Sequence, residues 1–185
     1  MNTVITSREA ILEKSREIIS IQGLAALNIR SVASACGVSV GSIYNYFHSK
    51  SDLTASAVED VWHDIFHFQE RAEDFACFPD CLKWIFGCMK NGSEKYPGFF
   101  TFHSMSFLGE EKEDGQRLMA QSWLHIQNVL IRVLENDQSV RPDAFGETLT
   151  RQEFVDIIFS FIISALVRRN YDSRAILEMV RRAIY

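Results

Sequence analysis

The chain has 185 residues, of which 47% are hydrophobic and 23% charged, and its formal net charge is −5. This length and composition are ordinary for a globular protein with a sizeable core, and an acidic chain does not bind nucleic acid indiscriminately. The N-terminus lacks the basic and apolar regions of a signal peptide, and the longest apolar run, 154–167, contains Asp156 and is too short to span a bilayer. We therefore expect a soluble cytoplasmic protein that does not associate with membranes.

The first predicted helix covers about residues 7–22, where apolar residues recur at helical spacing. Thr6 and Glu9 have the three-residue spacing of a capping box, which predicts where the helix begins. Gly23 predicts where it ends, because glycine adopts the left-handed cap conformation at little cost.

Two short helices are predicted next. Asn28 is a good N-cap for a helix over about 29–36, and Gly37 marks its end. Ser39 is placed to cap a third helix over about 40–46. The two helices are therefore joined by a tight turn.

Longer helices are predicted in the rest of the chain. Ser49 or Ser51 opens a fourth helix with one apolar face. Further helices are expected over 80–95, 97–108, 114–136, 151–170 and 172–184, with a loop over 137–149. No segment shows the period-two alternation of a strand bounded by turns, so the sequence predicts an all-α fold.

The two short helices have the features of a helix-turn-helix, in which the second helix lies in the major groove of DNA. Steep packing of two short helices needs a small residue at the contact and a turn residue with positive φ, which Ala33 and Gly37 supply. Apolar anchors are also present: Val32, Cys36, Val38, Ile43 and Tyr46. Residues 1–50 carry five basic and three acidic side chains, whereas the remainder of the chain is acidic. A DNA-binding domain over 1–50 and a second helical domain over 51–185 follow from this reading.

The exposed face of the second short helix would present small and polar residues to the groove: Ser39, Val40, Gly41, Ser42 and Asn45. Serine and asparagine hydrogen-bond base edges or phosphates, and a valine can contact a thymine methyl group. The residues that follow are placed to contact phosphates: Tyr44, Tyr46, His48 and Lys50. The start of the fourth helix, at Ser49–Asp52, would offer backbone N–H groups to an anion.

This segment resembles the N-terminal region of the tetracycline-repressor (TetR) family of bacterial transcription regulators over about residues 7–55. The matching residues are Ala33, Gly37, Val38, Gly41, Ile43, Tyr44, Tyr46, Phe47, Lys50 and Leu53. The resemblance implies phosphate contacts by Tyr44, Tyr46 and Lys50, with Arg30 and Ser31 near the flanking backbone. Tyr46 is equally well interpreted as a core anchor, and Phe47 is better interpreted as core than as a DNA contact.

The last two predicted helices are rich in apolar residues, and a helix that is apolar nearly all round must be buried on several sides. The family resemblance implies that they form a dimer interface, and a two-fold protein suits a palindromic operator. The candidate interface residues are Phe154, Ile158, Phe161, Ile162, Ala165, Ile176 and Val180. An ordinary monomer core is the alternative.

Aromatic residues are dense in the middle of the chain, and together they suggest a largely apolar ligand pocket between helices. The candidate lining residues are Trp62, Phe66, Trp84, Met89, Phe102, His103 and Trp123. Each of them taken singly is also explained as plain core. His63 and His67 have an i,i+4 spacing that can bind a metal, but no third ligand is evident, so we expect neither a metal nor a cofactor.

Cys77 and Cys81 are four residues apart, unlike a Cys-x-x-Cys site, and we expect the four cysteines to behave as small apolar residues. No catalytic motif emerges, so we do not expect an enzyme. We expect a homodimeric repressor that a small apolar or aromatic effector releases from an operator by tilting the fourth helix. The rival hypothesis is a helical protein that binds or processes small molecules and retains a vestigial DNA module.

Overall fold

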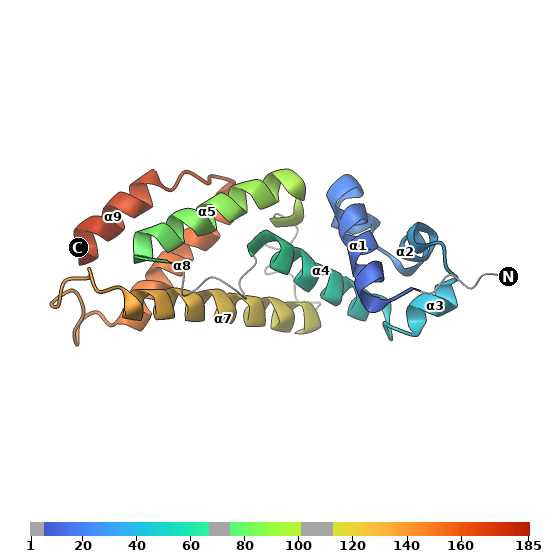
Figure 1. Ribbon diagram of the computed structural model, residues 1–185, viewed down its shortest axis with the longest axis horizontal. Coiled ribbons are helices and arrows are strands. Elements are labelled where there is room, and N and C mark those ends of the chain that lie inside the picture. The colour runs from blue at the N-terminus through green and yellow to red at the C-terminus, as the bar shows by residue number, and fades with distance from the viewer. Residues whose placement is uncertain (1–5, 67–74, 101–112) are drawn as a thin grey trace. The chain divides into compact units, whose positions relative to one another are not determined.

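The computed structural model describes residues 6–66, 75–100 and 113–185, and within the last range it describes the side chains from 123 onward except that of residue 125. These residues form helices and no strand, which confirms the all-α prediction (Figure 1). The helices are α1 (Arg8–Gln22), η1 (Leu24–Ala26), α2 (Ile29–Cys36), α3 (Val40–Tyr44), α4 (Lys50–Phe66), α5 (Phe78–Lys95), α7 (Glu113–Asn136), α8 (Arg151–Arg168) and α9 (Arg174–Ile184). None of the helices described is long and apolar enough to cross a membrane.

The helix ends follow local capping signals. Asn28 caps α2 by accepting hydrogen bonds from the N–H groups of Arg30 and Ser31, and the Ser31 hydroxyl completes a capping box. Gly37 ends α2 in the left-handed region at φ 66°, and Gly23 ends α1 at φ 81°. The predicted bounds of α1 and α2 are confirmed.

Two predictions about the N-terminal helices need correction. Ser7, and not Thr6, is the N-cap of α1, because the Ser7 side chain accepts a hydrogen bond from the N–H of Ala10. The two hydroxyl residues are neighbours, and local spacing alone does not choose between them. The third helix ends at Tyr44 and so is shorter than predicted, with Asn45 as its C-cap. Most of the helix predicted over 97–108 lies outside the described residues.

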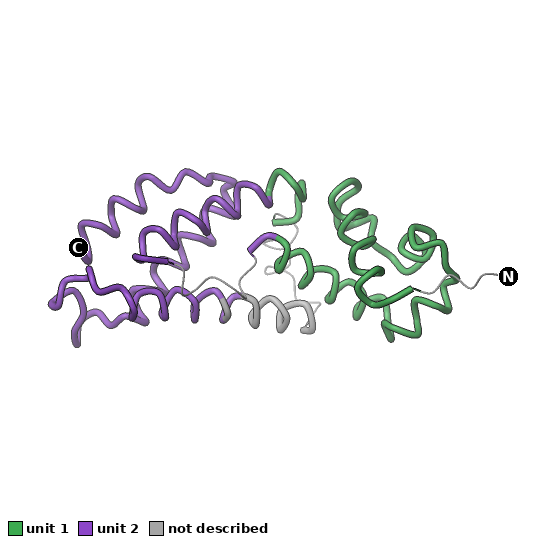
Figure 2. The backbone as a smooth tube through the Cα atoms, viewed as in Figure 1, with its two compact units in different colours: residues 1–64, 93–118 green, residues 65–92, 119–185 purple. Residues whose placement is uncertain are grey.

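The chain divides into two compact units (Figure 2). The first contains residues 1–64 and 93–118, and the second contains residues 65–92 and 119–185. The division therefore falls within α4, α5 and α7. The expected domain boundary at residue 50 stays a prediction, because compactness and domain function are different criteria.

The first unit has a core beneath the two short helices. Ile11 of α1, Val32 of α2 and Ile43 of α3 are fully buried, as is Phe47 in the segment before α4. The guanidinium of Arg8 lies 5.3 Å from the centre of the Phe47 ring. This core holds α2 and α3 in place, and it confirms that Phe47 is a core residue.

The second unit is built on α5, α8, α9 and the described part of α7. Asp137, which follows α7, is buried and accepts hydrogen bonds from the Phe78 N–H at 2.8 Å, from the Ser139 N–H at 3.0 Å and from the Tyr185 hydroxyl. One carboxylate therefore joins the start of α5, the loop after α7 and the residue after α9.

Candidate nucleic-acid interface

The turn between α2 and α3 has the geometry that a helix-turn-helix requires. Gly37 adopts φ 66°, and the Val38 N–H donates to the Ala33 carbonyl at 3.0 Å. Ala33 is buried, as the predicted close contact needs, and Ile43 of α3 is fully buried. This combination fixes α3 with one face in the core and the other in solvent.

The outer face of α3 presents the predicted groove-facing residues. Ser39, Val40, Gly41 and Asn45 are exposed, and Ser42 is half-buried. The Ser39 hydroxyl accepts a hydrogen bond from the Ser42 N–H at 3.1 Å and lies 2.9 Å from the Ser42 hydroxyl. Both serines therefore serve the helix cap and remain on the surface.

Gly41 is not required by the fold of the chain itself. A Cβ built on Gly41 would meet only the Ser39 Oγ, at an ordinary contact distance of 3.7 Å. A glycine in a helix is less favourable than alanine by about 1 kcal/mol. Packing within the chain therefore does not explain why residue 41 is a glycine. Close approach of the α3 backbone to DNA explains it better.

The last residue of α3 and several residues after it are exposed, as phosphate contacts need to be. Tyr44 and Tyr46 are 48% and 39% exposed, and His48 and Lys50 are also exposed. The Tyr46 hydroxyl donates to the Thr6 carbonyl at 2.5 Å, so this side chain joins the segment before α1 to the segment after α3. The alternative that Tyr46 is a core anchor is wrong.

The first turn of α4 is held by hydrogen bonds to side chains of the same segment. The Asp52 N–H donates to the Ser49 hydroxyl at 3.0 Å, and the Asp52 carboxylate accepts from the His48 N–H at 2.8 Å. One of the expected donors, the Asp52 N–H, is thus used by the chain's own side chain. This arrangement confirms that Ser49 opens α4, and anion binding at this turn stays a prediction.

Arg30 and Ser31 lie in the first turn of α2. Arg30 is exposed, whereas the Ser31 hydroxyl accepts from the Asn28 N–H at 3.0 Å and donates to the Ala26 carbonyl at 3.0 Å. Ser31 therefore has a structural task in the capping box. Contacts of either residue with a DNA backbone stay predictions.

The structure separates the predicted pocket residues between the two units. In the first unit Trp62 contacts the rings of Phe99 and Phe100, with centroids 5.7 and 5.6 Å away. In the second unit Phe66 contacts Trp84, with centroids 6.4 Å apart. Met89 of the second unit is fully buried, and the Trp123 ring contacts that of Phe159. Phe102 and His103 lie outside the described residues.

The predicted interface residues of α8 and α9 mostly pack within their own chain. Six of the seven are buried in the protomer: Phe154, Ile158, Ile162, Ala165, Ile176 and Val180. Phe161 is 45% exposed, together with Ile157 at 47% and Met179 at 38%. Ile157 and Met179 were not among the predicted interface residues. For Ile157 the reason is that α8 is apolar on most of its circumference, so its pattern does not show which side faces solvent.

The histidine and cysteine predictions concern possible metal and redox chemistry. His63 is exposed on α4, and His67 lies outside the described residues. In the part of the chain that the structure describes, no three His, Cys, Asp or Glu residues are grouped to hold a metal ion. Cys81 is fully buried, and burial raises the pKa of its thiol to about 12, as expected of a small apolar residue.

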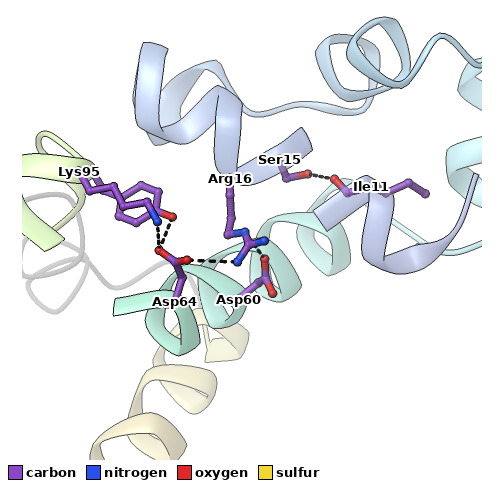
Figure 3. Close-up of polar contacts among 7 residues, drawn as sticks. Ile11, Ser15, Arg16, Asp60, Asp64 and Lys95 are labelled. Carbon is purple, nitrogen blue, oxygen red and sulfur yellow. Dashed lines mark hydrogen bonds and ion pairs between the residues drawn. The ribbon is translucent and has the colours of Figure 1, made fainter. Parts of the chain in front are cut away.

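A polar cluster that the sequence did not reveal joins α1, α4 and the end of α5 in the first unit. It joins Arg16 of α1, Asp60 and Asp64 of α4, and the residues Lys95 and Tyr96 (Figure 3). The only local signal was the i,i+4 spacing of the two aspartates. Their cationic partners are distant in the sequence, so no spacing rule finds them.

The tight turn at Gly37 and the exposed face of α3 define a helix-turn-helix domain of the DNA-binding class. Exposed tyrosines and a lysine at and after the end of α3 agree with this class. Residues 11–57 match the family model described as "Bacterial regulatory proteins, tetR family". The match covers the helix-turn-helix segment and agrees with the resemblance found in the sequence.

Comparisons with individual proteins agree with this assignment. The "Uncharacterized HTH-type transcriptional regulator YerO" of Bacillus subtilis (strain 168) is 40% identical over 52 residues, which are 28% of this chain and 18% of YerO. The chain thus matches less than a fifth of the length of that relative.

Two solved structures share the fold over nearly the whole chain. The transcriptional regulator FadR from Bacillus subtilis, solved in complex with stearoyl-CoA, has a TM-score of 0.69 at 18% identity, with 97% of this chain and 100% of that chain covered. The TetR family transcriptional regulator PfmR from Thermus thermophilus has a TM-score of 0.59 at 17% identity, with 98% and 99% covered. The helices after residue 57 therefore complete a fold that TetR-family regulators also have.

Proposed function

We propose that this protein is a cytoplasmic transcriptional repressor that binds a palindromic operator as a homodimer and is released by a small, largely apolar effector. The observation that carries the proposal is the exposed outer face of α3, with Gly41 at a position where the chain's own packing does not require glycine. A surface of small and polar residues on a rigidly held helix suits the major groove.

Dimerisation is supported by apolar side chains that a single protomer leaves in solvent. Ile157 and Phe161 are four residues apart on one face of α8, and Met179 is exposed on α9. Phe161, Ala165, Ile176 and Met179 also line an open hollow of about 280 Å³ in the second unit. Exposed apolar surface of this kind marks interaction sites, and a second copy of the chain presents the same surface in return.

The effector is proposed from the aromatic side chains of the helices that follow the DNA-binding segment. Phe66 and Trp84 contact each other in the second unit, and Phe75 contacts Trp84 at 5.5 Å between centroids. Apolar and aromatic side chains typically line ligand sites in helical proteins. The structural neighbour FadR was solved with stearoyl-CoA, which combines a long apolar chain with a polar head.

Selection of DNA from a library of random duplexes tests the proposal directly. The wild-type protein should enrich an inverted repeat whose half-sites are separated by about one helical turn or a multiple of it. Failure to enrich any sequence would reject the proposed function.

A pair of lysine variants sharpens that test. Lys50→Gln should weaken binding of all duplexes alike and lower the salt dependence, because an exposed phosphate contact is lost. Lys14→Gln is the matched control, since Lys14 pairs with Glu17 on α1 at 2.8 Å. Equal effects of the two substitutions would show that Lys50 has no special place at the DNA.

A further inference from the structure

The polar cluster that joins α1, α4 and the end of α5 begins with a single arginine that reaches two carboxylates. The Nε of Arg16 lies 3.0 Å from the Asp60 Oδ2, and its Nη1 lies 3.4 Å from the Asp64 Oδ1 (Figure 3). Asp60 and Asp64 are one helical turn apart on α4, so their side chains lie on the same face. The planar guanidinium therefore fixes α1 against α4 at two points.

Asp64 also binds the end of α5. Its Oδ2 lies 2.6 Å from the Lys95 Nζ and accepts a hydrogen bond from the Tyr96 hydroxyl at 2.7 Å. The Tyr96 ring is buried, with its centre 6.1 Å from that of Phe99. The Ser20 hydroxyl of α1 donates to the Lys95 carbonyl at 2.8 Å. The end of α5 is thus held by both α1 and α4.

Charge balance makes these contacts interdependent. Burial raises the pKa of Asp60 and Arg16 opposes that effect, whereas hydrogen bonds from Lys95 and Tyr96 outweigh burial and lower the pKa of Asp64. Removing either cation leaves two partly buried carboxylates with a single cation, which is more costly than losing one exposed ion pair. Each contact of the cluster therefore depends on the others.

The residues next to the cluster leave little room for relative motion of α4 and α5. In the second unit, a Cβ built on Gly92 of α5 would lie 2.9 Å from the Cγ2 of Ile65 on α4. Isoleucine is branched at Cβ and has few alternative rotamers. A methyl group at Gly92 would therefore push α5 and Ile65 apart, one residue after Asp64 on α4 and three residues before Lys95 on α5.

We propose that Arg16, Asp60, Asp64, Lys95 and Tyr96 form a coupling junction that transmits displacements of α5 to α1 and α4 together, and thereby to the DNA-reading helices. The inference rests on the proposed function and adds the route by which an effector signal reaches the DNA surface. An effector changes the affinity for DNA only if it binds the DNA-binding state and the DNA-releasing state with different affinities. That difference requires a structural link between the effector and the DNA surface.

A double-mutant cycle tests the coupling without knowledge of the effector. Gly92→Ala displaces α5 from Ile65, and Lys95→Gln with Tyr96→Phe removes both donors to the Asp64 Oδ2. The dissociation constant for the duplex selected by the wild-type protein is measured by fluorescence anisotropy for the wild type, each change and their combination. Effects of the lost lysine charge on DNA affinity cancel in the cycle.

Gly92→Ala should change the dissociation constant by about fivefold or more when the junction is intact, a typical size for coupling between sites. In the Lys95→Gln, Tyr96→Phe background the same change should be less than about twofold, because the route is cut. Equal effects in the two backgrounds, or no effect with the junction intact, would overturn the inference.

Two controls separate coupling from general damage. Gly87→Ala introduces the same methyl group on α5 with nothing within 4 Å, so DNA affinity should not change. Lys14→Gln removes an exposed ion pair within α1 alone, so the effect of Gly92→Ala should persist in that background.

Hydrogen exchange provides a second test that does not depend on Gly92→Ala folding or on DNA. Amides of α1 and α4 should exchange faster in the Lys95→Gln, Tyr96→Phe variant than in the wild type, while those of α9 should be unchanged. Unchanged exchange in α1 would overturn the junction. If instead the wild type enriches no duplex, the proposed function fails, and hydrogen exchange still decides whether the junction couples α5 to α1.

Discussion

Gly41 lies within α3, and a Cβ built there meets only the Ser39 hydroxyl, at 3.7 Å. The neighbouring Ile43 is fully buried, so α3 has one residue that the core requires and another that the core does not. This contrast distinguishes residues that hold the helix in place from residues that are available to DNA.

Gly41→Ala should therefore separate stability from binding. The free energy of unfolding should be unchanged or rise by up to about 1 kcal/mol, because alanine favours a helix. Affinity for the selected duplex should fall by about tenfold, or about 1.4 kcal/mol, because the methyl group keeps the helix backbone from the groove. Urea unfolding and fluorescence anisotropy measure the two quantities. Unchanged affinity would show that α3 does not approach the duplex closely at this position.

At the scale of elements, α5 contains two glycines with opposite surroundings. Gly87 is exposed, and a Cβ there meets nothing within 4 Å, whereas a Cβ at Gly92 lies 2.9 Å from Ile65. Substitution by alanine at Gly87 therefore tests helix propensity alone, whereas the same substitution at Gly92 also tests close packing.

Gly87→Ala should raise the free energy of unfolding by about 0.5–1 kcal/mol, because the helix interior gains a better helix former. Gly92→Ala should lower it by about 1–3 kcal/mol, because the added methyl group is too close to Ile65 and pushes α5 away from it. Thermal or urea unfolding followed by circular dichroism measures both. Stabilisation by both substitutions would mean that α4 and α5 are not closely packed at Gly92.

Asp137 gives a pH-dependent prediction at the ends of α5, α7 and α9. Although burial opposes the effect, hydrogen bonds from Ser139, Tyr185 and the Phe78 N–H lower the pKa of Asp137. The folded pKa is thus below the ordinary value of about 3.9, so stabilisation is complete above that value and is lost as the pH falls through the folded pKa.

Asp137→Asn should make the protein less stable at neutral pH and flatten the loss of stability in acid. Urea unfolding at several values between about pH 6 and about pH 3 measures the slope. Asp143→Asn is the matched control, because the Asp143 side chain is 86% exposed and lies 3.4 Å from the Arg141 Nε. If the free energy of unfolding falls as steeply with decreasing pH in Asp137→Asn as in the wild type, Asp137 does not have the proposed stabilising role.

The sequence predicted the elements where local chemistry decides and missed the features that depend on distant partners. The Asn28 side chain caps the start of α2, and Gly37 ends the helix because glycine adopts positive φ easily. Both signals are local, so α2 was placed correctly. Arg16 pairs with carboxylates far along the chain, and no local pattern announces this. Because α8 is apolar on most sides, its sequence pattern is compatible with burial of any of its faces. The pattern therefore did not distinguish the buried Ile158 from the exposed Ile157.

At the scale of the whole molecule, the exposed side chains of α8 and α9 predict self-association. Phe161→Glu should convert a dimer into a monomer in sedimentation equilibrium, because a charge in an apolar interface is left without a partner. Ile21→Glu is the matched control, since Ile21 is 80% exposed on α1 and outside this surface. A dimer that survives Phe161→Glu, or a wild-type monomer, would contradict the proposed interface.

The central claim, that the helix-turn-helix of this protein reads a specific DNA sequence, is tested most directly by the salt dependence of binding to the selected duplex and to a scrambled one. The affinity for both should fall linearly on a log–log plot against salt, and the selected duplex should bind at least about a thousandfold more tightly. Equal affinities for the two duplexes, or binding that does not respond to salt, would contradict the account.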